Sequence, residues 1–208
     1  MTNIVFLIGA GVAAALLSLL VLTLLIPTLR IWPTPGEKTW QSYVFWPLFR
    51  SLNVMCFVVA VASYSNFLGL PMWIRLAALA VLITSIAVFI YSFRVLGRDN
   101  SYGAQDGLVI AGIYRWSRNP QNAMLMVVYG ALAIAADSGP AYVLCLAMIA
   151  VYVLMVLAEE PWLAAAYGEP YRDYCRRAPR FFNWRLAATE GRRLLRGKTA
   201  TDPVNRGP

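Results

Sequence analysis

The chain has 208 residues, of which 60% are hydrophobic and only 13% are charged. Soluble domains carry about 25% charged residues and about 45–50% apolar ones, so this composition excludes a disordered chain and disfavours a soluble monomer. The net charge is +8, and the basic residues gather at the ends of apolar runs and in the C-terminal part of the chain. That distribution favours contact with anionic lipid headgroups over contact with nucleic acid.

Five apolar runs follow one another along the chain, covering residues 4–26, 43–68, 72–93, 123–136 and 141–158. A membrane-spanning helix needs roughly 20 apolar residues. The first run is too long for a signal-peptide core and has no basic leader, so we expect it to be a retained span. The fourth run is short, and Asp137-Ser138-Gly139-Pro140 joins it to the fifth, which predicts a tight helical hairpin. We therefore predict an all-α integral membrane protein with five transmembrane helices.

Lys and Arg residues alternate between the two sides of this predicted bundle. They follow the first run and the third run, and ten of them lie between Arg172 and Arg206, whereas only Arg75 follows the second run. Because cytoplasmic loops carry the excess of Lys and Arg, we expect the N-terminus outside and the C-terminus in the cytoplasm of a bacterial inner membrane. We predict one domain over residues 1–184 and a basic interfacial or disordered tail over residues 185–208.

Several kinds of chemistry are not indicated. The chain contains no His, which removes the commonest general base and the commonest transition-metal ligand. Cys56, Cys145 and Cys175 are scattered and form no CxxC pair, so we expect neither a disulfide framework nor a metal site. Without a partner base, no Ser, Thr or Cys is indicated as a nucleophile.

Most acidic residues and many aromatic ones lie in two polar segments, 94–122 and 159–180, which flank the predicted hairpin. The hairpin returns both segments to the same membrane face, which predicts a composite pocket there. Glu159 and Glu160 directly follow an apolar run, and one interpretation is that they only mark the exit of the helix from lipid. The other is that they bind a cation, because adjacent carboxylates repel each other and a helix C-terminus disfavours anions. The aromatic residues are also consistent with an interfacial belt.

Two motifs occur in order around the hairpin. The first is Gly112-x-Tyr114-Arg115-x-x-Arg118-Asn119-Pro120, and the second is Glu159-Glu160-x-x-Leu163-x-x-x-Tyr167-Gly168-x-x-Tyr171-x-x-Tyr174, followed by Pro179-Arg180. Together they resemble the integral-membrane methyltransferases, which include isoprenylcysteine carboxyl methyltransferases and phospholipid N-methyltransferases. The resemblance covers about residues 94–182.

The resemblance implies that S-adenosylmethionine binds at the cytoplasmic face and that a lipid-like substrate reaches it from the bilayer. The cofactor contacts that it implies are Asp99, Asp106, Gly107, Leu108, Val109, Gly112, Tyr114, Asn119, Pro120, Gln121, Asn122 and Glu159. Glu159 can pair with the α-ammonium of the cofactor, and aromatic rings can hold its sulfonium by cation–π attraction. We expect Glu160, Arg118 and Asn119 to act in catalysis, with Glu160 as the candidate general base for an amine acceptor.

The chain departs from the family pattern at two positions. Asn119-Pro120 and Glu159-Glu160-Pro161 resemble the phospholipid enzymes, but Asn122 stands where both branches have Tyr. Met155 stands where the isoprenylcysteine enzymes place an Arg for the substrate carboxylate, which makes a carboxylate substrate less favoured.

The expected acceptor is therefore a lipid or another hydrophobic molecule, either a phospholipid amine headgroup or an isoprenylcysteine-like group. Three alternatives stay open: a small-thiol S-methyltransferase of the same superfamily, an NADPH-dependent enzyme similar to the sterol reductases, and a small transporter or membrane assembly protein. The expected partners are the hydrophobic substrate and membrane lipids, and we do not expect nucleic acid to bind. The sequence does not indicate an oligomeric state.

Overall fold

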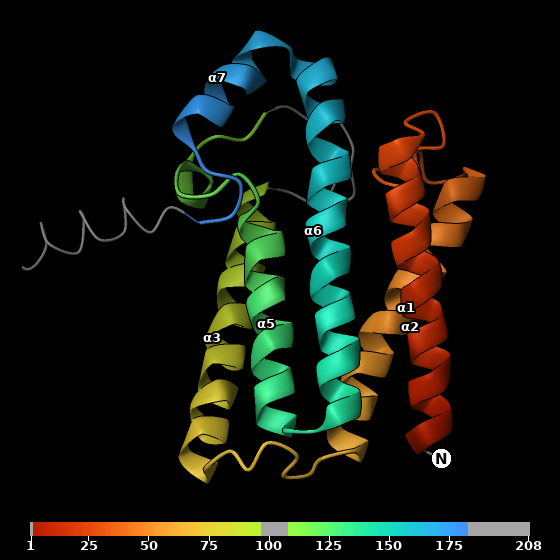
Figure 1. Cartoon of the computed structure of the whole chain (residues 1–208). Coiled ribbons are helices and arrows are strands. Elements are labelled where there is room, and N and C mark those ends of the chain that lie inside the picture. Colours follow the sequence, from red (N-terminus) through yellow and green to blue (C-terminus); the bar gives the residue numbers. More distant parts are fainter. Residues whose placement is uncertain (1, 97–107, 183–208) are drawn as a thin grey trace, which may run out of the picture.

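A computed structural model describes residues 2–96 and 108–182 of the chain. All regular elements in these ranges are helices, which confirms the predicted all-α class for the described residues (Figure 1). In chain order they are α1 (Thr2–Leu25), α2 (Trp40–Ala62), α3 (Met72–Leu96), η1 (Gly112–Arg115), α5 (Pro120–Ala136), α6 (Gly139–Tyr167) and α7 (Glu169–Arg177). The predicted tail over residues 185–208 lies outside the described residues.

Four of the described helices, α1, α2, α3 and α6, are long and apolar enough to cross a membrane. The helix α5 is apolar but has only 17 residues. At 1.5 Å per residue it reaches about 26 Å, somewhat less than the roughly 30 Å of a bilayer's hydrocarbon core. Each predicted apolar run thus contains a helix, although the second run continues to residue 68 and α2 ends at Ala62. Four of these helices are long enough to span a membrane, and a fifth span stays a prediction.

The predicted tight hairpin between α5 and α6 is confirmed. Asp137 adopts a left-handed conformation with φ of 46°, and its N–H donates to the carbonyl of Ala133 at 2.9 Å, which ends α5. Ser138 then caps α6, because its Oγ accepts a hydrogen bond from the N–H of Ala141 at 3.2 Å. Since two residues separate the helices, α5 and α6 lie antiparallel and side by side (Figure 1).

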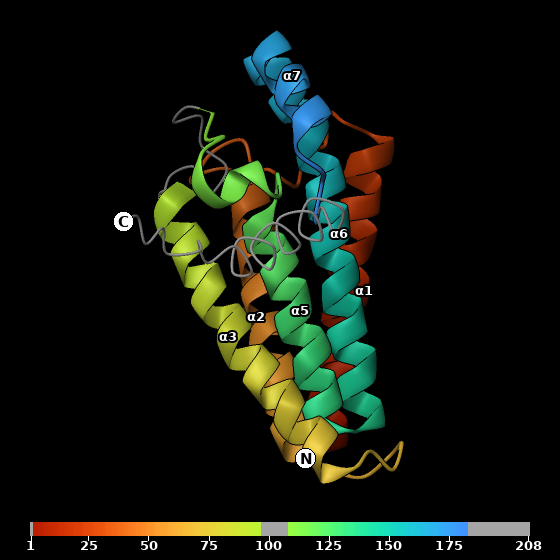
Figure 2. The ribbon, with the colours of Figure 1, turned by 90° about the vertical axis from the view of Figure 1, so that its left-hand side faces the viewer.

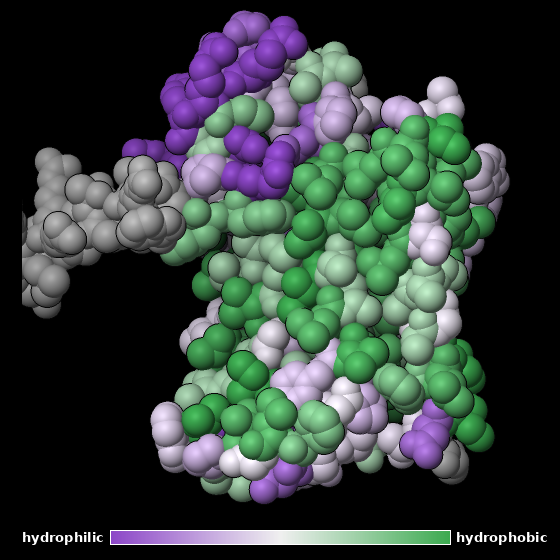
Figure 3. Space-filling view, viewed as in Figure 1, coloured by the Kyte–Doolittle hydropathy of each residue, from purple (hydrophilic) through white to green (hydrophobic). Residues whose placement is uncertain are grey.

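The helices form two groups joined by this hairpin. The helix α3 packs on α5, whereas α1 packs on α6, and α2 packs on α1, α5 and α6 (Figures 1 and 2). The main core consists of fully buried side chains such as Leu16 of α1, Leu52 of α2 and Met148 of α6. On the face shown in Figure 3, the surface of the long helices is mainly hydrophobic, while hydrophilic residues gather over α7. This division is typical of helices that face lipid and carry a polar segment at one end.

The end of the bundle opposite α7 is closed by buried polar contacts. The guanidinium of Arg75 donates to the carbonyls of Ala135 and Ala136 at 3.1 and 3.2 Å and lies over the ring of Tyr64. These contacts satisfy carbonyls that the end of α5 leaves without helical partners. Arg75 therefore stabilises the fold at this end of the molecule, away from the motifs.

One sequence prediction about α6 is wrong. The sequence predicts that the helix ends near Ala158, with the two glutamates at its C-terminus, but α6 continues through Pro161 to Tyr167. Pro161 removes one helical hydrogen bond without ending the helix. Because a further two turns follow the glutamates, the helix dipole gives no reason for a cation to bind them. Any such reason has to come from their individual surroundings.

Candidate active site

A cavity of about 650 Å³ lies among the helices toward the end of the bundle that carries α7. Small-molecule sites typically enclose about 300–1,000 Å³, so its size fits a ligand of that class. Side chains from the α1–α2 connection, α2, α3, α5, α6, α7 and the segment before α5 form its walls. The walls are largely aromatic and aliphatic, with a small number of polar groups.

Both sequence motifs contribute to this cavity. Among the predicted site residues, those that line it are Leu108, Val109, Tyr114, Arg118, Asn119, Gln121, Asn122 and Glu159. Gly112, Pro120 and Glu160 do not line it. Asp99, Asp106 and Gly107 lie outside the described residues. The predicted composite pocket therefore exists, and the hairpin α5–α6 brings its two halves together.

Part of the cavity comes from residues that the motifs do not include. Trp32 in the α1–α2 connection and Trp46, Phe49, Arg50 and Asn53 of α2 line the wall that faces the motifs. The only sequence signal for this wall is that Arg50 and Asn53 are polar residues inside an apolar run. Their intramembrane position points to a functional role.

Glu159 is the acidic group of the described cavity wall. Its side chain is half-buried, and the indole Nε1 of Trp32 donates a hydrogen bond to its Oε2 at 3.4 Å. Within residues 2–96 and 108–182 it forms no ion pair. A carboxylate that has lost part of its water and has no basic partner is stabilised when a cation binds beside it.

Tyr114 supplies a second polar group on the wall. Its hydroxyl is buried and makes no hydrogen bond of normal geometry among the described residues, although the Gln121 side chain is close enough to influence it. Burial raises the pKa of Tyr114, so the phenol is neutral at physiological pH. A neutral phenol in this position can donate a hydrogen bond to a ligand.

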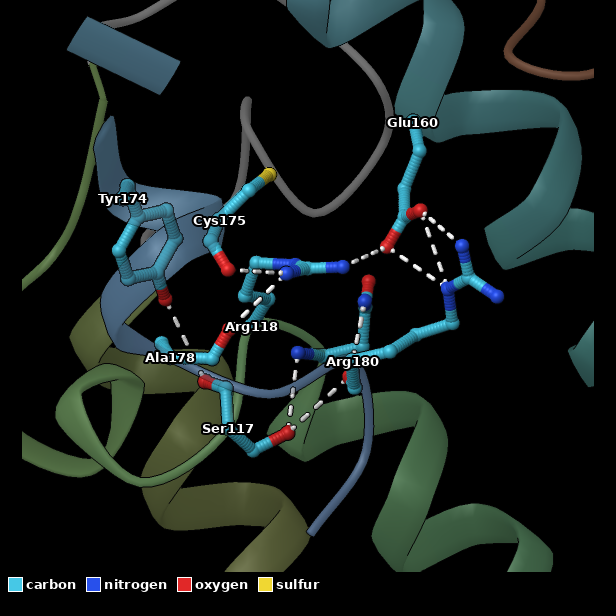
Figure 4. A network of polar contacts seen from close by, with 8 residues as sticks. Ser117, Arg118, Glu160, Tyr174, Cys175, Ala178 and Arg180 are labelled. Carbon is cyan, nitrogen blue, oxygen red and sulfur yellow. Dashed lines mark hydrogen bonds and ion pairs between the residues drawn. The ribbon is translucent and has the colours of Figure 1, made fainter. Parts of the chain in front are cut away.

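Glu160 has a different environment, although it is the next residue in α6. Its Oε1 lies 2.7 Å from Nη2 of Arg118, and its Oε2 lies 2.6 Å from Nη2 of Arg180 (Figure 4). The Arg118 and Glu160 side chains are 10% and 14% exposed, so this pair is mostly removed from water. The hydrogen bonds from Arg180 to Glu160 raise the pKa of the Arg180 guanidinium, which is permanently charged here.

The same network attaches the C-terminal part of α7 and the segment after it to the segment before α5. Arg118 Nη1 donates to the carbonyls of Cys175 and Ala178 at 3.0 and 2.9 Å (Figure 4). Tyr174 donates its hydroxyl proton to the carbonyl of Tyr114 at 2.6 Å, and Asn119 Nδ2 donates to the carbonyl of Arg180 at 3.1 Å. These contacts join the two motifs directly, so they fix the position of the cavity wall that Tyr114 and Asn119 form.

Two predicted cofactor contacts have conformational roles in the structure. Gly112 adopts φ of +59° at the start of η1, a region that favours glycine, and among the described residues a Cβ there would meet only Val95, at 3.7 Å. Pro120 occupies the first turn of α5, where its missing N–H costs nothing. Both residues shape the backbone on which the lining residues stand.

Comparison with known proteins agrees with this geometry. Residues 73–170 match the phospholipid methyltransferase family. This match runs from α3 to the start of α7 and contains the first motif and most of the second, so the resemblance to membrane methyltransferases is confirmed. The family implies methyl transfer to lipids, in keeping with four helices long enough to span a membrane. No curated protein and no solved structure matches the chain.

The cavity extends beyond the residues matched to the phospholipid methyltransferase family. The wall formed by Trp32 and α2 precedes the match, and Tyr171 and Tyr174 follow it. The matched segment therefore supplies the first motif and most of the second, while one side of the ligand space is built from residues outside the match.

Proposed function

We propose that this protein transfers a methyl group from S-adenosylmethionine to the amine of a phospholipid headgroup. The observation that carries the proposal is the position of Glu159. It is an acid without a basic partner among the described residues, and it lies in a cavity of ligand size beside the matched motifs.

The residues of the cavity fit the methyl donor. Glu159 would hold the α-ammonium of the donor, and the hydroxyl of Tyr114 would donate to one of its polar groups. The aromatic walls suit the positively charged sulfonium, because cation–π attraction strengthens when water is excluded. Asn119 and Asn122 offer further hydrogen bonds along the same wall.

A phospholipid amine is the acceptor class that these observations favour. The matched family acts on phospholipids. Met155 lines the cavity and is buried, so this position offers no cation for the carboxylate of an isoprenylcysteine substrate. Apolar residues of α2 and α3 form the remainder of the wall and suit the hydrocarbon part of a lipid.

When bound, the donor would supply a methyl group on a sulfonium. The headgroup ammonium would first lose a proton to bulk solvent, its freed lone pair would then form the N–C bond, and the C–S bond would break to leave a neutral thioether. The chain's own task is to hold the acceptor in line and to exclude water. Glu160 and Arg118 act as positioning residues in this proposal, because both oxygens of Glu160 already accept hydrogen bonds from Arg118 or Arg180. Glu160 also does not line the cavity, so we do not assign it the role of general base.

The proposal is tested with the purified protein in lipid nanodiscs that contain phosphatidylethanolamine. With labelled S-adenosylmethionine, we expect N-methylated phosphatidylethanolamine by mass spectrometry, together with binding of S-adenosylhomocysteine. Stabilisation by NADPH in a thermal-shift assay, without stabilisation by S-adenosylhomocysteine, would instead favour the reductase alternative. If the protein neither binds S-adenosylhomocysteine nor transfers a methyl group, the proposed function is rejected.

A further inference from the structure

The cavity reaches the lipid-facing surface between α2 and α3. Both helices pack on α5, but within the described residues they make no extensive contact with each other. Val54 of α2 and Phe89 and Phe93 of α3 nevertheless line the same cavity, and Val54 is 61% exposed. A molecule in the bilayer can therefore approach the cavity sideways, between these two helices.

Arg50 lies on α2 at this opening. It is one turn of helix before Val54, lines the cavity and is exposed. Its guanidinium lies over the ring of Trp46, 5.4 Å from the ring centroid, and none of the ion pairs among the described residues includes it. Cation–π contact uses one face of the guanidinium, so the N–H donors at its edge stay available to an anion.

Without a ligand, the charge of Arg50 inside α2 has an unfavourable free energy in a bilayer. The helix runs from Trp40 to Ala62, which puts Arg50 near its middle, and charged side chains at such positions are expensive in a bilayer. They are retained where they face a pathway or a charged ligand. Arg50 faces such a pathway, because it lines the cavity at its lipid-facing side.

We propose that Arg50 binds the phosphodiester of an amine phospholipid that enters between α2 and α3. This inference rests on the proposed function and names the group that selects its substrate. Arg50 and Glu159 give one cavity a cation and an anion on different elements, α2 and α6. A headgroup held by its phosphate at Arg50 presents its amine toward the interior, where the methyl donor is proposed to bind.

The apolar rim favours a lipid over a soluble phosphate compound. Val54, Phe89 and Phe93 surround the opening and offer a surface for acyl chains. A soluble phosphate ester has no part that would use this surface.

The test compares Arg50→Gln, Arg50→Lys and the control Arg94→Gln, an exposed Arg of α3 that does not line the cavity. The acceptors are phosphatidylethanolamine in nanodiscs and hexadecylamine, which has an amine and a chain but no phosphate. A hydrogen-bonded charge pair contributes about 1.5–3 kcal/mol, so Arg50→Gln should lower kcat/KM for phosphatidylethanolamine by roughly 10- to 100-fold. Hexadecylamine methylation and S-adenosylhomocysteine affinity should be unchanged, and Arg50→Lys should restore part of the activity.

Other outcomes overturn the inference in distinguishable ways. Equal losses with both acceptors would give Arg50 a structural role, and no loss with phosphatidylethanolamine would remove it from the site. Equally good methylation of soluble glycerophosphoethanolamine, with the same dependence on Arg50, would indicate a general phosphate site. Methylation of no acceptor by the unaltered protein would reject the proposed function and this inference together.

Discussion

Glu159 and Glu160 are neighbours in the chain with opposite surroundings. Successive residues of an α-helix point about 100° apart, so the two side chains leave α6 in different directions. Glu160 meets two guanidinium groups, whereas Glu159 meets the cavity and the indole of Trp32. Glu160 is therefore already paired within the protein, and Glu159 is available to a ligand.

Tyr114→Phe tests whether the buried hydroxyl serves a ligand. Because this hydroxyl has no hydrogen bond of normal geometry among the described residues, its removal should leave the melting temperature of the unliganded protein unchanged or higher. Loss of one ligand hydrogen bond should weaken S-adenosylhomocysteine binding by about 5- to 10-fold, or about 1–1.5 kcal/mol. Thermal unfolding and calorimetric titration measure the two effects. A lower melting temperature with unchanged binding would contradict this role.

At the scale of elements, the contact between α7 and the segment before α5 depends on Glu160. Removing one partner of a mostly buried ion pair costs about 3–5 kcal/mol, so Glu160→Ala should destabilise the protein and increase hydrogen exchange in α7. The control is Glu169→Ala, which breaks exposed pairs with Arg172 and Arg176 and should change the stability far less, because water screens exposed ion pairs. Equal effects of the two variants on thermal unfolding would show that the network does not hold α7.

The start of η1 depends on the conformation of Gly112. Its φ of +59° disfavours any residue with a Cβ, so Gly112→Ala should destabilise by about 1–2 kcal/mol without a steric clash. Gly130→Ala is the matched control, since Gly130 lies inside helix α5 and a Cβ there meets no other described residue within 4 Å. Thermal unfolding should separate the two variants, and an identical melting temperature for both would show that the left-handed conformation carries no cost.

At the scale of the whole molecule, the opening between α2 and α3 connects the bilayer with the cavity. Val54→Trp should obstruct it, lowering methyl transfer to phosphatidylethanolamine several-fold while leaving S-adenosylhomocysteine affinity unchanged. Val61→Trp is the control, because Val61 is 76% exposed on the same helix but does not line the cavity. Equal transfer rates for the two variants would show that lipid reaches the cavity by another route.

The sequence predicts much of this arrangement. Apolar runs and the Asp137–Pro140 turn predict the helices and the hairpin, because hydrophobicity and turn chemistry are local properties. The motifs predict that Tyr114 and Glu159 share one pocket. The continuation of α6 beyond Glu160 is not predicted, since Pro161 ordinarily ends a helix.

The wall formed by α2 could not be predicted in this way. Trp46 and Arg50 meet the motifs only through the packing of α2 on α5 and α6, and such long-range contacts leave no periodic signal in the sequence. The pairing of Arg118 with Glu160 across 42 positions is equally dependent on the folded hairpin.

The most direct test of the account is the affinity of Glu159→Gln for S-adenosylhomocysteine, measured by calorimetry in nanodiscs beside Glu169→Gln. The glutamine keeps the size of the side chain and removes its charge. Loss of a charge-assisted contact worth about 1.5–3 kcal/mol predicts affinity roughly 10- to 100-fold weaker for Glu159→Gln and unchanged for Glu169→Gln. Unchanged affinity in both variants would contradict the assignment of Glu159 to the methyl donor.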